Sequence, residues 1–181
     1  MTDLPHPWNE FLAELDEQLK EPVDLHCIGG FVCTYFYGLA RRTGDIDYFT
    51  TVPNTPNIAE IAGGGSPLPK KWGISLHCVP FINLPDNYDA RLVDMMPGKY
   101  KNLRMLVLDP YDLILSKLER NSTKDRDDAD YLFRSRKLDS TTLRARYKEE
   151  LRPYLAKEKW HDRTLDLWIE IFEGNPTSYL R

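Results

Sequence analysis

The segment from Cys27 to Phe49, CIGGFVCTYFYGLARRTGDIDYF, contains the features that decide the fold. Leu25–Ile28 is typical of a short strand that runs into the pair Gly29 and Gly30. Glycine lets the backbone come close to a ligand, and a helix that begins there directs free N–H groups at it. Phe31–Leu39 is apolar nearly all round, which predicts a helix buried against a sheet. We therefore expect a phosphate-binding corner at the two glycines.

Two acidic residues follow that helix on a predicted strand, Asp45–Thr51. Residues two apart on a strand point to the same face, so Asp45 and Asp47 are expected to place two carboxylates side by side. Divalent metal ions bind to such paired carboxylates. A surface strand with ordinary alternation of polar and apolar residues is the alternative interpretation.

The Gly-Gly turn, the buried helix and the Asp-x-Asp strand together resemble the active-site signature of the nucleotidyltransferase superfamily. The spelling Arg41-x-Thr43-x-Asp45-x-Asp47 is similar to the AbiEii-like toxin branch and to related bacterial stand-alone domains. The segment Val107–Tyr131 resembles the second block of that branch, in which a helical lysine is followed by a basic-acidic segment. The resemblance implies an α+β fold with a small, mixed, twisted sheet.

The resemblance also implies a reaction. It implies an enzyme that transfers NMP from an NTP substrate to tRNA or a partner protein with Mg (or Mn), in a toxin–antitoxin or defence system. Two alternatives stay open: an antitoxin-type protein adenylyltransferase that modifies a paired toxin, and a catalytically degenerate nucleotide-binding module. Nucleotide binding without turnover would indicate the last of these.

Under the resemblance, Asp45 and Asp47 are the catalytic metal ligands, and Gly29 and Gly30 hold the β- and γ-phosphates. Arg41 is either a phosphate contact or structural support, since a guanidinium can bind either a phosphate or a carboxylate. Thr43 is expected to bind nucleotide or to fix the turn before Asp45.

A third metal-binding carboxylate is harder to find. Related enzymes place one on the strand next to the Asp-x-Asp strand, but the predicted strand Ile74–Ile82 carries no acid. Asp94, on a following predicted strand, is the nearest acid and is our candidate for a catalytic metal ligand. His77 is the alternative ligand or base, and the absence of any third ligand is equally open.

Lys117 falls inside the apolar arc of a helix predicted from Pro110 to Arg120, whereas Asp112 falls on the opposite side. A buried amine needs an anion or a ligand, so the resemblance makes Lys117 a nucleotide contact and catalytic residue; snorkelling to the rim is the alternative. Asp125 and Asp128 match the last acidic motif of the branch and are expected to bind nucleotide or to orient Lys117.

Part of the segment Val107–Tyr131 can also be explained by helix caps. Ser122-x-x-Asp125 has the form of a capping box, which would account for Asp125 without any catalytic role. Further helix starts are predicted at Asp109-Pro110 and at Asp139 or Ser140.

The composition of the 181 residues is that of an ordinary globular protein, with 41% hydrophobic and 29% charged residues. The formal net charge of −4 provides no global positive field for nucleic acid, although local basic patches leave RNA open as a partner. No apolar run reaches the length of a membrane helix and no signal peptide is recognisable, so we expect a cytoplasmic protein. Cys27, Cys33 and Cys78 are expected to be buried, reduced thiols.

The remaining pattern predicts the organisation of the chain. Residues 1–109 should form the nucleotidyltransferase-like core and 110–181 a helical portion that closes the active cleft, all within one compact domain. The other predicted elements are helices at 8–19, 58–62, 122–136 and 162–172, and strands at 23–28, 90–95 and 103–107.

Overall fold

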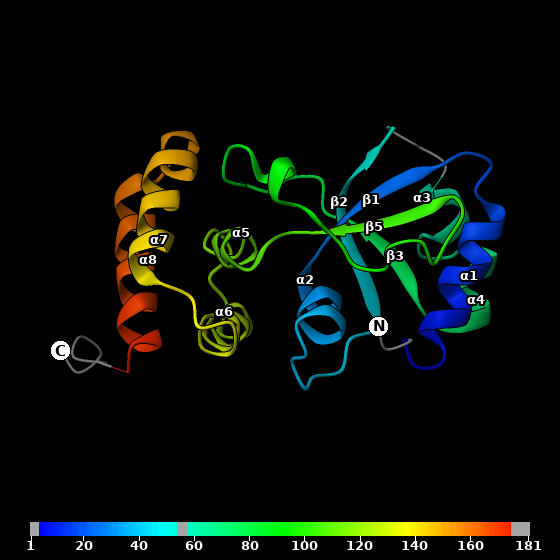
Figure 1. Ribbon diagram of the computed structural model, residues 1–181, viewed down its shortest axis with the longest axis horizontal. Helices are drawn as coiled ribbons and strands as arrows, with labels where there is room; N and C mark the ends of the chain where they lie inside the picture. Colours follow the sequence, from blue (N-terminus) through cyan, green and yellow to red (C-terminus); the bar gives the residue numbers. More distant parts are fainter. Residues whose placement is uncertain (1–3, 54–57, 175–181) are drawn as a thin grey trace. The chain divides into compact units, whose positions relative to one another are not determined.

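A mixed five-stranded sheet organises the first part of the chain in the computed structural model, which describes residues 4–53 and 58–174 (Figure 1). Its strands in the order β3-β2-β1-β5-β4 are Ser75–Cys78, Asp45–Val52, Val23–Ile28, Leu103–Val107 and Val93–Asp94. β1 is antiparallel to β2 and parallel to β5, β2 is parallel to β3, and β4 is antiparallel to β5. The predicted α+β class with a small mixed sheet is confirmed.

The chain divides into two compact units. The first comprises Met1–Phe81 and Leu92–Leu108, and the second comprises Ile82–Arg91 and Asp109–Arg181. The main part of the second unit thus begins at Asp109, beside the predicted boundary at residue 110. The second unit also includes Ile82–Arg91, which lies between β3 and β4 in the sequence.

The two faces of the sheet differ in polarity. Leu25 pairs with Met105 and is buried with it in the core. The alternate residues, Asp24 and Arg104, form an ion pair on the other face. Asp47 pairs with Ile28, which lies on the same face as Asp24 because side chains alternate along a strand. We call this second face, which carries Asp24, Arg104 and Asp47, the polar face.

Helices cover the apolar face of the sheet in the first unit. α1 (Trp8–Gln18), α3 (Ile58–Ala62) and α4 (Pro67–Trp72) pack against one another beside the sheet (Figure 1). Phe11, Leu12 and Leu15 of α1 are fully buried, as their three- and four-residue spacing predicts. Asp16 at the end of α1 accepts hydrogen bonds from the backbone N–H groups of Asn102 and Leu103, which fixes α1 against the start of β5.

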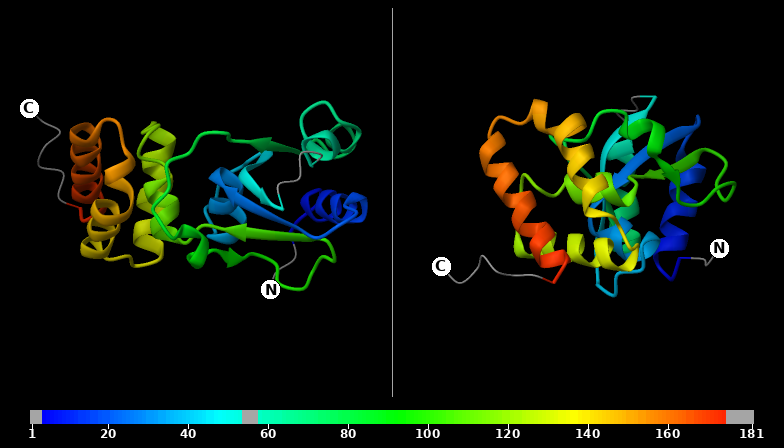
Figure 2. Two further views of the ribbon diagram at one scale, coloured as in Figure 1. Left: turned by 90° about the horizontal axis from the view of Figure 1, so that it is seen from above. Right: turned by 60° about the vertical axis from the view of Figure 1, so that its left-hand side comes forward.

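The second unit is helical, and in Figures 1 and 2 its helices α7 and α8 lie side by side. Its elements are η2 (Tyr88–Arg91), α5 (Pro110–Leu115), α6 (Thr123–Ser135), α7 (Ser140–Arg146), η3 (Tyr147–Leu151), η4 (Arg152–Tyr154) and α8 (Glu158–Phe172). Trp168 is fully buried, and Phe133 of α6 stacks on Phe172 of α8 with ring centroids 5.0 Å apart. None of the described helices has both the length and the apolarity needed to cross a membrane.

The predicted helix starts are confirmed by their caps. The Asp109 side chain accepts a hydrogen bond from the N–H of Asp112, and Asp139 caps α7 through the N–H of Thr142. Ser122 and Asp125 form both hydrogen bonds of a capping box. Each cap satisfies N–H groups that the first turn of a helix leaves without a partner.

Several predicted boundaries are wrong. The strand predicted at 74–82 ends at Cys78, two residues before Pro80, which cannot donate a ladder hydrogen bond. The strand predicted at 90–95 is a 3₁₀ turn, η2, followed by the two-residue β4. The helix predicted to reach Arg120 ends at Leu115, since Lys117 and Leu118 make tighter bonds to the carbonyl groups three residues back.

Two other predicted helices have different bounds. The helix predicted at Phe31–Leu39 is α2 (Gly29–Phe31) followed by a π-helical turn, η1 (Val32–Phe36), and ends three residues earlier than predicted. The helix predicted at 162–172 begins four residues earlier, at Glu158. The helix α4 was not predicted, although Ser66-Pro67 and Gly73 are ordinary start and stop signals for it. Cys27 and Cys33 are buried free thiols as expected, but Cys78 is exposed.

Candidate active site

The two motif carboxylates lie at the start of β2, on the polar face of the sheet. Asp45 pairs with Ser75 and Asp47 with His77 on the parallel neighbour β3. The residue between them, Ile46, is fully buried on the other face. The strand alternation therefore places both carboxylates on one face, as the sequence predicts.

The carboxylate of Asp47 lies against the backbone of Gly29. Gly29 has φ +77°, and a Cβ built on it would lie 2.3 Å from Oδ2 of Asp47. Any side chain at this position would collide with the carboxylate and would also strain the backbone. The glycine thus makes room for Asp47 at the point where β1 ends and α2 begins.

Arg41 and Thr43 lie over the second glycine. A Cβ on Gly30 would lie 2.9 Å from Nη2 of Arg41 and 3.4 Å from Oγ1 of Thr43. The hydroxyl of Thr43 lies 3.3 Å from Oδ1 and also 3.3 Å from the carbonyl oxygen of Asp45, and donates toward them. The structure therefore brings the glycine pair, Arg41, Thr43 and the two carboxylates together, all within the first unit.

His77 is the side chain that accompanies Asp47 from the neighbouring strand. Its Nδ1 lies 3.0 Å from Oδ1 of Asp47. The imidazole is largely exposed and Asp47 is about a quarter exposed. The position beside the Asp-x-Asp strand is thus held by a histidine.

The donors at this corner suit a hard divalent cation. Mg²⁺ in proteins is usually bound by one or two carboxylates together with water and substrate phosphates, and Asp45 and Asp47 supply two carboxylates. The described residues contain no group of three or more His, Cys, Asp or Glu side chains arranged to hold a metal. Two carboxylates, one of them against the backbone of Gly29, are therefore what the described part of the chain offers such an ion.

Asp94, our candidate for the third carboxylate, lies elsewhere on the sheet. It is on β4, which β5 and β1 separate from β2. Three strand spacings amount to roughly 14 Å. Its Oδ1 accepts a hydrogen bond from the N–H of Met96. The structure does not bring Asp94 beside Asp45 and Asp47, because β5 inserts between β1 and β4.

Lys117 lies in the second unit and is buried, as the helix pattern predicts. Its Nζ is 3.0 Å from Oδ2 of Asp128 and 3.7 Å from Oδ1 of Asp125. Both aspartates are buried on α6. The amine therefore does not snorkel to the rim, and buried carboxylates supply the anion that it needs.

Asp125 is held by more partners than Lys117 alone. Arg120 donates two hydrogen bonds to its carboxylate, and the hydroxyl and N–H of Ser122 donate two more. Burial opposes the ionisation of Asp125, but these hydrogen bonds and the charge of Lys117 outweigh it and lower its pKa to about 2. The capping interpretation of Asp125 is confirmed, and its carboxylate is ionised at neutral pH.

Asp112 was predicted on the polar side of its helix, and this prediction is wrong. It is completely buried, and Arg91 and Arg146 both bind it. Burial raises its pKa, partly offset by the hydrogen bonds from Arg91. Two basic side chains far away in the sequence thus turn a polar helix position into an interior one, which a helical wheel does not reveal.

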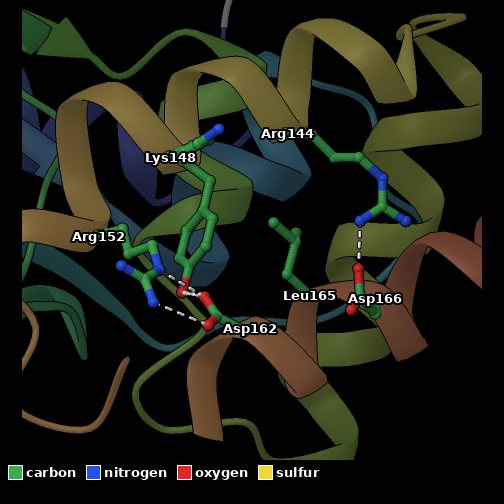
Figure 3. Close-up of a pocket in the computed structure, with 7 residues that line it drawn as sticks. Arg144, Lys148, Arg152, Asp162, Leu165 and Asp166 are labelled. Atoms are coloured by element: carbon green, nitrogen blue, oxygen red, sulfur yellow. Dashed lines mark hydrogen bonds and ion pairs between the residues drawn. The ribbon is translucent and has the colours of Figure 1, made fainter. Parts of the chain in front are cut away.

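A groove of about 420 Å³ lies between the α7–η4 segment and α8 (Figure 3). Arg144 pairs with Asp166 at one end, and Arg152 with Asp162 at the other. Burial, and the hydrogen bond that it donates to Asp162, raise the pKa of Tyr147 in this groove. The groove includes none of the predicted site residues, and its ion pairs are satisfied within the unit.

Comparison with known protein families supports the resemblance to nucleotidyltransferases. A family model described as "Nucleotidyltransferase of unknown function (DUF6036)" matches residues 9–174, a span that includes the glycine pair, both motif aspartates and Lys117. Searches of the curated proteins and of the solved structures found no match. The AbiEii-like branch stays a prediction. With the match extending over most of its length, the chain belongs to this family of nucleotidyltransferases of unknown function.

Proposed function

We propose that this protein transfers a nucleoside monophosphate from an NTP to a macromolecular acceptor in a reaction that depends on Mg²⁺ or Mn²⁺. The observation that supports it best is the corner at which Asp45 and Asp47 share one face of β2 and Oδ2 of Asp47 lies over Gly29. The family to which the chain belongs supports the transferase class.

The reaction forms a bond between an acceptor oxygen and the α-phosphorus of the NTP and breaks the bond to the bridging oxygen, so that pyrophosphate leaves. The acceptor hydroxyl loses its proton to solvent or to a base. When bound, the metal ion would neutralise phosphate charge and lower the pKa of the attacking hydroxyl.

The residues of the first unit have distinct roles in this proposal. Asp45 and Asp47 would hold the metal, and the bare backbone of Gly29 and Gly30 would let phosphates approach. Arg41, whose guanidinium lies against Gly30, would contact a phosphate. Asp94 has no part in this centre, because of its place on β4.

The roles proposed for residues of the second unit rest on the resemblance. Lys117 would contact the nucleotide phosphates while Asp128 and Asp125 orient its amine. The ammonium group has three N–H donors and one of them donates to Asp128, so a phosphate would accept from another. The acceptor would be tRNA or a partner protein, and the biological setting a toxin–antitoxin or defence system.

A second candidate function is a nucleotide-binding module without turnover. The observation that favours it is His77, which occupies the place on β3 next to Asp47 and cannot supply a third carboxylate. Binding of NTP and metal without label transfer would indicate this function.

The test incubates the purified full chain with each α-³²P-labelled NTP, Mg²⁺ or Mn²⁺, and either a tRNA pool or a protein lysate. Asp45→Asn and Asp47→Asn should each reduce transfer about 100-fold or more, since each removes a ligand of a metal that stabilises the transition state by several kcal/mol. Asp24→Asn is the matched control, an acidic residue on the same polar face paired with Arg104, and should transfer normally. Unchanged transfer in both motif variants would overturn the proposal, and the labelled macromolecule identifies the acceptor.

A further inference from the structure

The contact between His77 and Asp47 is fixed by the sheet. β2 and β3 run parallel with Asp47 and His77 in register, so their side chains lie on the same face. The 3.0 Å separation joins Nδ1 of the imidazole to Oδ1 of the carboxylate. An ionised carboxylate can only accept a hydrogen bond, so Nδ1 is the nitrogen that donates.

The two oxygens of Asp47 have different surroundings. Oδ1 accepts from His77, whereas Oδ2 lies over Gly29, where a Cβ would come within 2.3 Å. The carboxylate is thus held from one side by β3 and lies against the glycine corner on the other. The oxygen left available for a ligand is the one nearest the corner where phosphates would bind.

Asp45 has a corresponding donor of its own. Oγ1 of Thr43 lies 3.3 Å from Oδ1 of Asp45. Each of the two carboxylates therefore has a separate hydrogen-bond donor on one oxygen. Such outer donors fix the orientation of ligating carboxylates, and removing one typically lowers metal affinity 10- to 100-fold.

We infer that His77 is a positioning residue: its Nδ1–H holds Asp47 in the orientation that directs Oδ2 to the glycine corner, and it is neither the third metal ligand nor the base. This inference rests on the proposed function. Without the hydrogen bond, the carboxylate could rotate between staggered χ1 positions, and a bound ion would have to fix it at a loss of affinity.

Substitutions at position 77 separate this role from the others. Asparagine carries an amide nitrogen at about the place of Nδ1, so His77→Asn can still donate to Asp47 but has no ring and cannot titrate. His77→Ala removes the donor. Both should fold, because the imidazole is mostly exposed. Cys78→Ser, one residue further along β3 and therefore on its other face, is the matched control.

The experiment measures binding of Mn²⁺ alone to the full chain from the paramagnetic resonance signal of the free ion. His77→Ala should weaken binding roughly 10- to 100-fold, His77→Asn should restore most of it, and Cys78→Ser should equal the wild type. In the metal-free wild type, ¹⁵N chemical shifts of the imidazole should identify Nδ1 as the protonated nitrogen.

The outcomes distinguish the inference from the proposed function. If Asp47→Asn loses Mn²⁺ while His77→Ala binds it as the wild type does, the metal site stands and the role of His77 is wrong. If alanine and asparagine at position 77 weaken binding equally, the ring itself is a ligand and positioning is overturned. A wild type that binds no Mn²⁺ overturns both the metal site and the role of His77.

Discussion

Lys117 and Asp128 form a buried ion pair, with 3.0 Å between Nζ and Oδ2 and side chains only 6% and 1% exposed. Asp125 lies 3.7 Å from the same amine. Removing one partner of such a pair leaves a charge in the interior without full compensation, which is far more destabilising than losing a surface pair.

Asp128→Asn should therefore lower the free energy of unfolding by about 3 kcal/mol. Urea unfolding followed by circular dichroism measures this quantity. Asp127→Asn is the control, since Asp127 is the exposed neighbour on the same helix α6, and it should change stability by less than about 0.5 kcal/mol. If the two substitutions lower the free energy of unfolding equally, the buried pair contributes no more to stability than an exposed carboxylate does.

Gly29→Ala should lower both the stability of the fold and the affinity of the proposed metal site. Alanine at φ +77° should lower the free energy of unfolding by about 1–2 kcal/mol. Its Cβ would also displace Oδ2 of Asp47, so Mn²⁺ affinity should fall. Gly44→Ala is the control, because a Cβ there meets no atom within 4 Å. An unchanged Mn²⁺ affinity in Gly29→Ala would contradict the place of this glycine in the site.

Much of the fold could be predicted because its signals are local. Asp109 and Ser122 satisfy N–H groups three residues away, so a cap is readable from a few letters of sequence. The alternation around Ile46 likewise places Asp45 and Asp47 on one face wherever β2 lies in the sheet.

The features that could not be predicted depend on contacts between residues far apart in the sequence, such as the pairing of strands in the sheet. Asp94 was predicted near Asp47 because it follows it along the chain, but β5 pairs with β1 and carries β4 to the far edge. The contact of His77 with Asp47 requires the parallel pairing of β2 and β3, and the sequence does not specify that register. Asp112 became buried through Arg91 and Arg146, which lie 21 and 34 residues away.

Asp125 should make stability depend on pH in the acid range. Its pKa is about 2 in the folded protein and about 3.9 when unfolded, so the unfolded chain takes up the proton first. The stability due to the ionised carboxylate is present above about pH 4 and is lost as the pH falls toward 2.

The stability difference between the wild type and Asp125→Asn should consequently be constant near neutral pH and shrink between about pH 4 and pH 2. Urea midpoints at a series of pH values measure it. Asp127→Asn, which replaces an exposed carboxylate on the same helix, should show no comparable change. A difference that stays constant down to pH 2 would mean that the hydrogen bonds from Arg120 and Ser122 do not favour ionisation.

Arg91 holds the segment Ile82–Arg91 to the rest of the second unit. It donates to both oxygens of Asp112, to Glu150 and to the carbonyl oxygen of Asp86. Arg91→Met should lower the free energy of unfolding by about 3 kcal/mol, because Asp112 is left buried with one basic partner fewer. Proteolysis within the segment should become faster, since its backbone loses the contact to Asp86.

Arg163→Met is the control for Arg91→Met, because Arg163 is exposed on α8 in the same unit, and it should leave stability within about 0.5 kcal/mol of the wild type. Urea unfolding and limited proteolysis with peptide mapping provide the two measurements. If Arg91→Met unfolds at the wild-type urea concentration but is cleaved faster between residues 82 and 91, Arg91 fixes the segment without stabilising the helices. If neither quantity changes, Arg146 alone neutralises Asp112, and the segment belongs to the second unit for another reason.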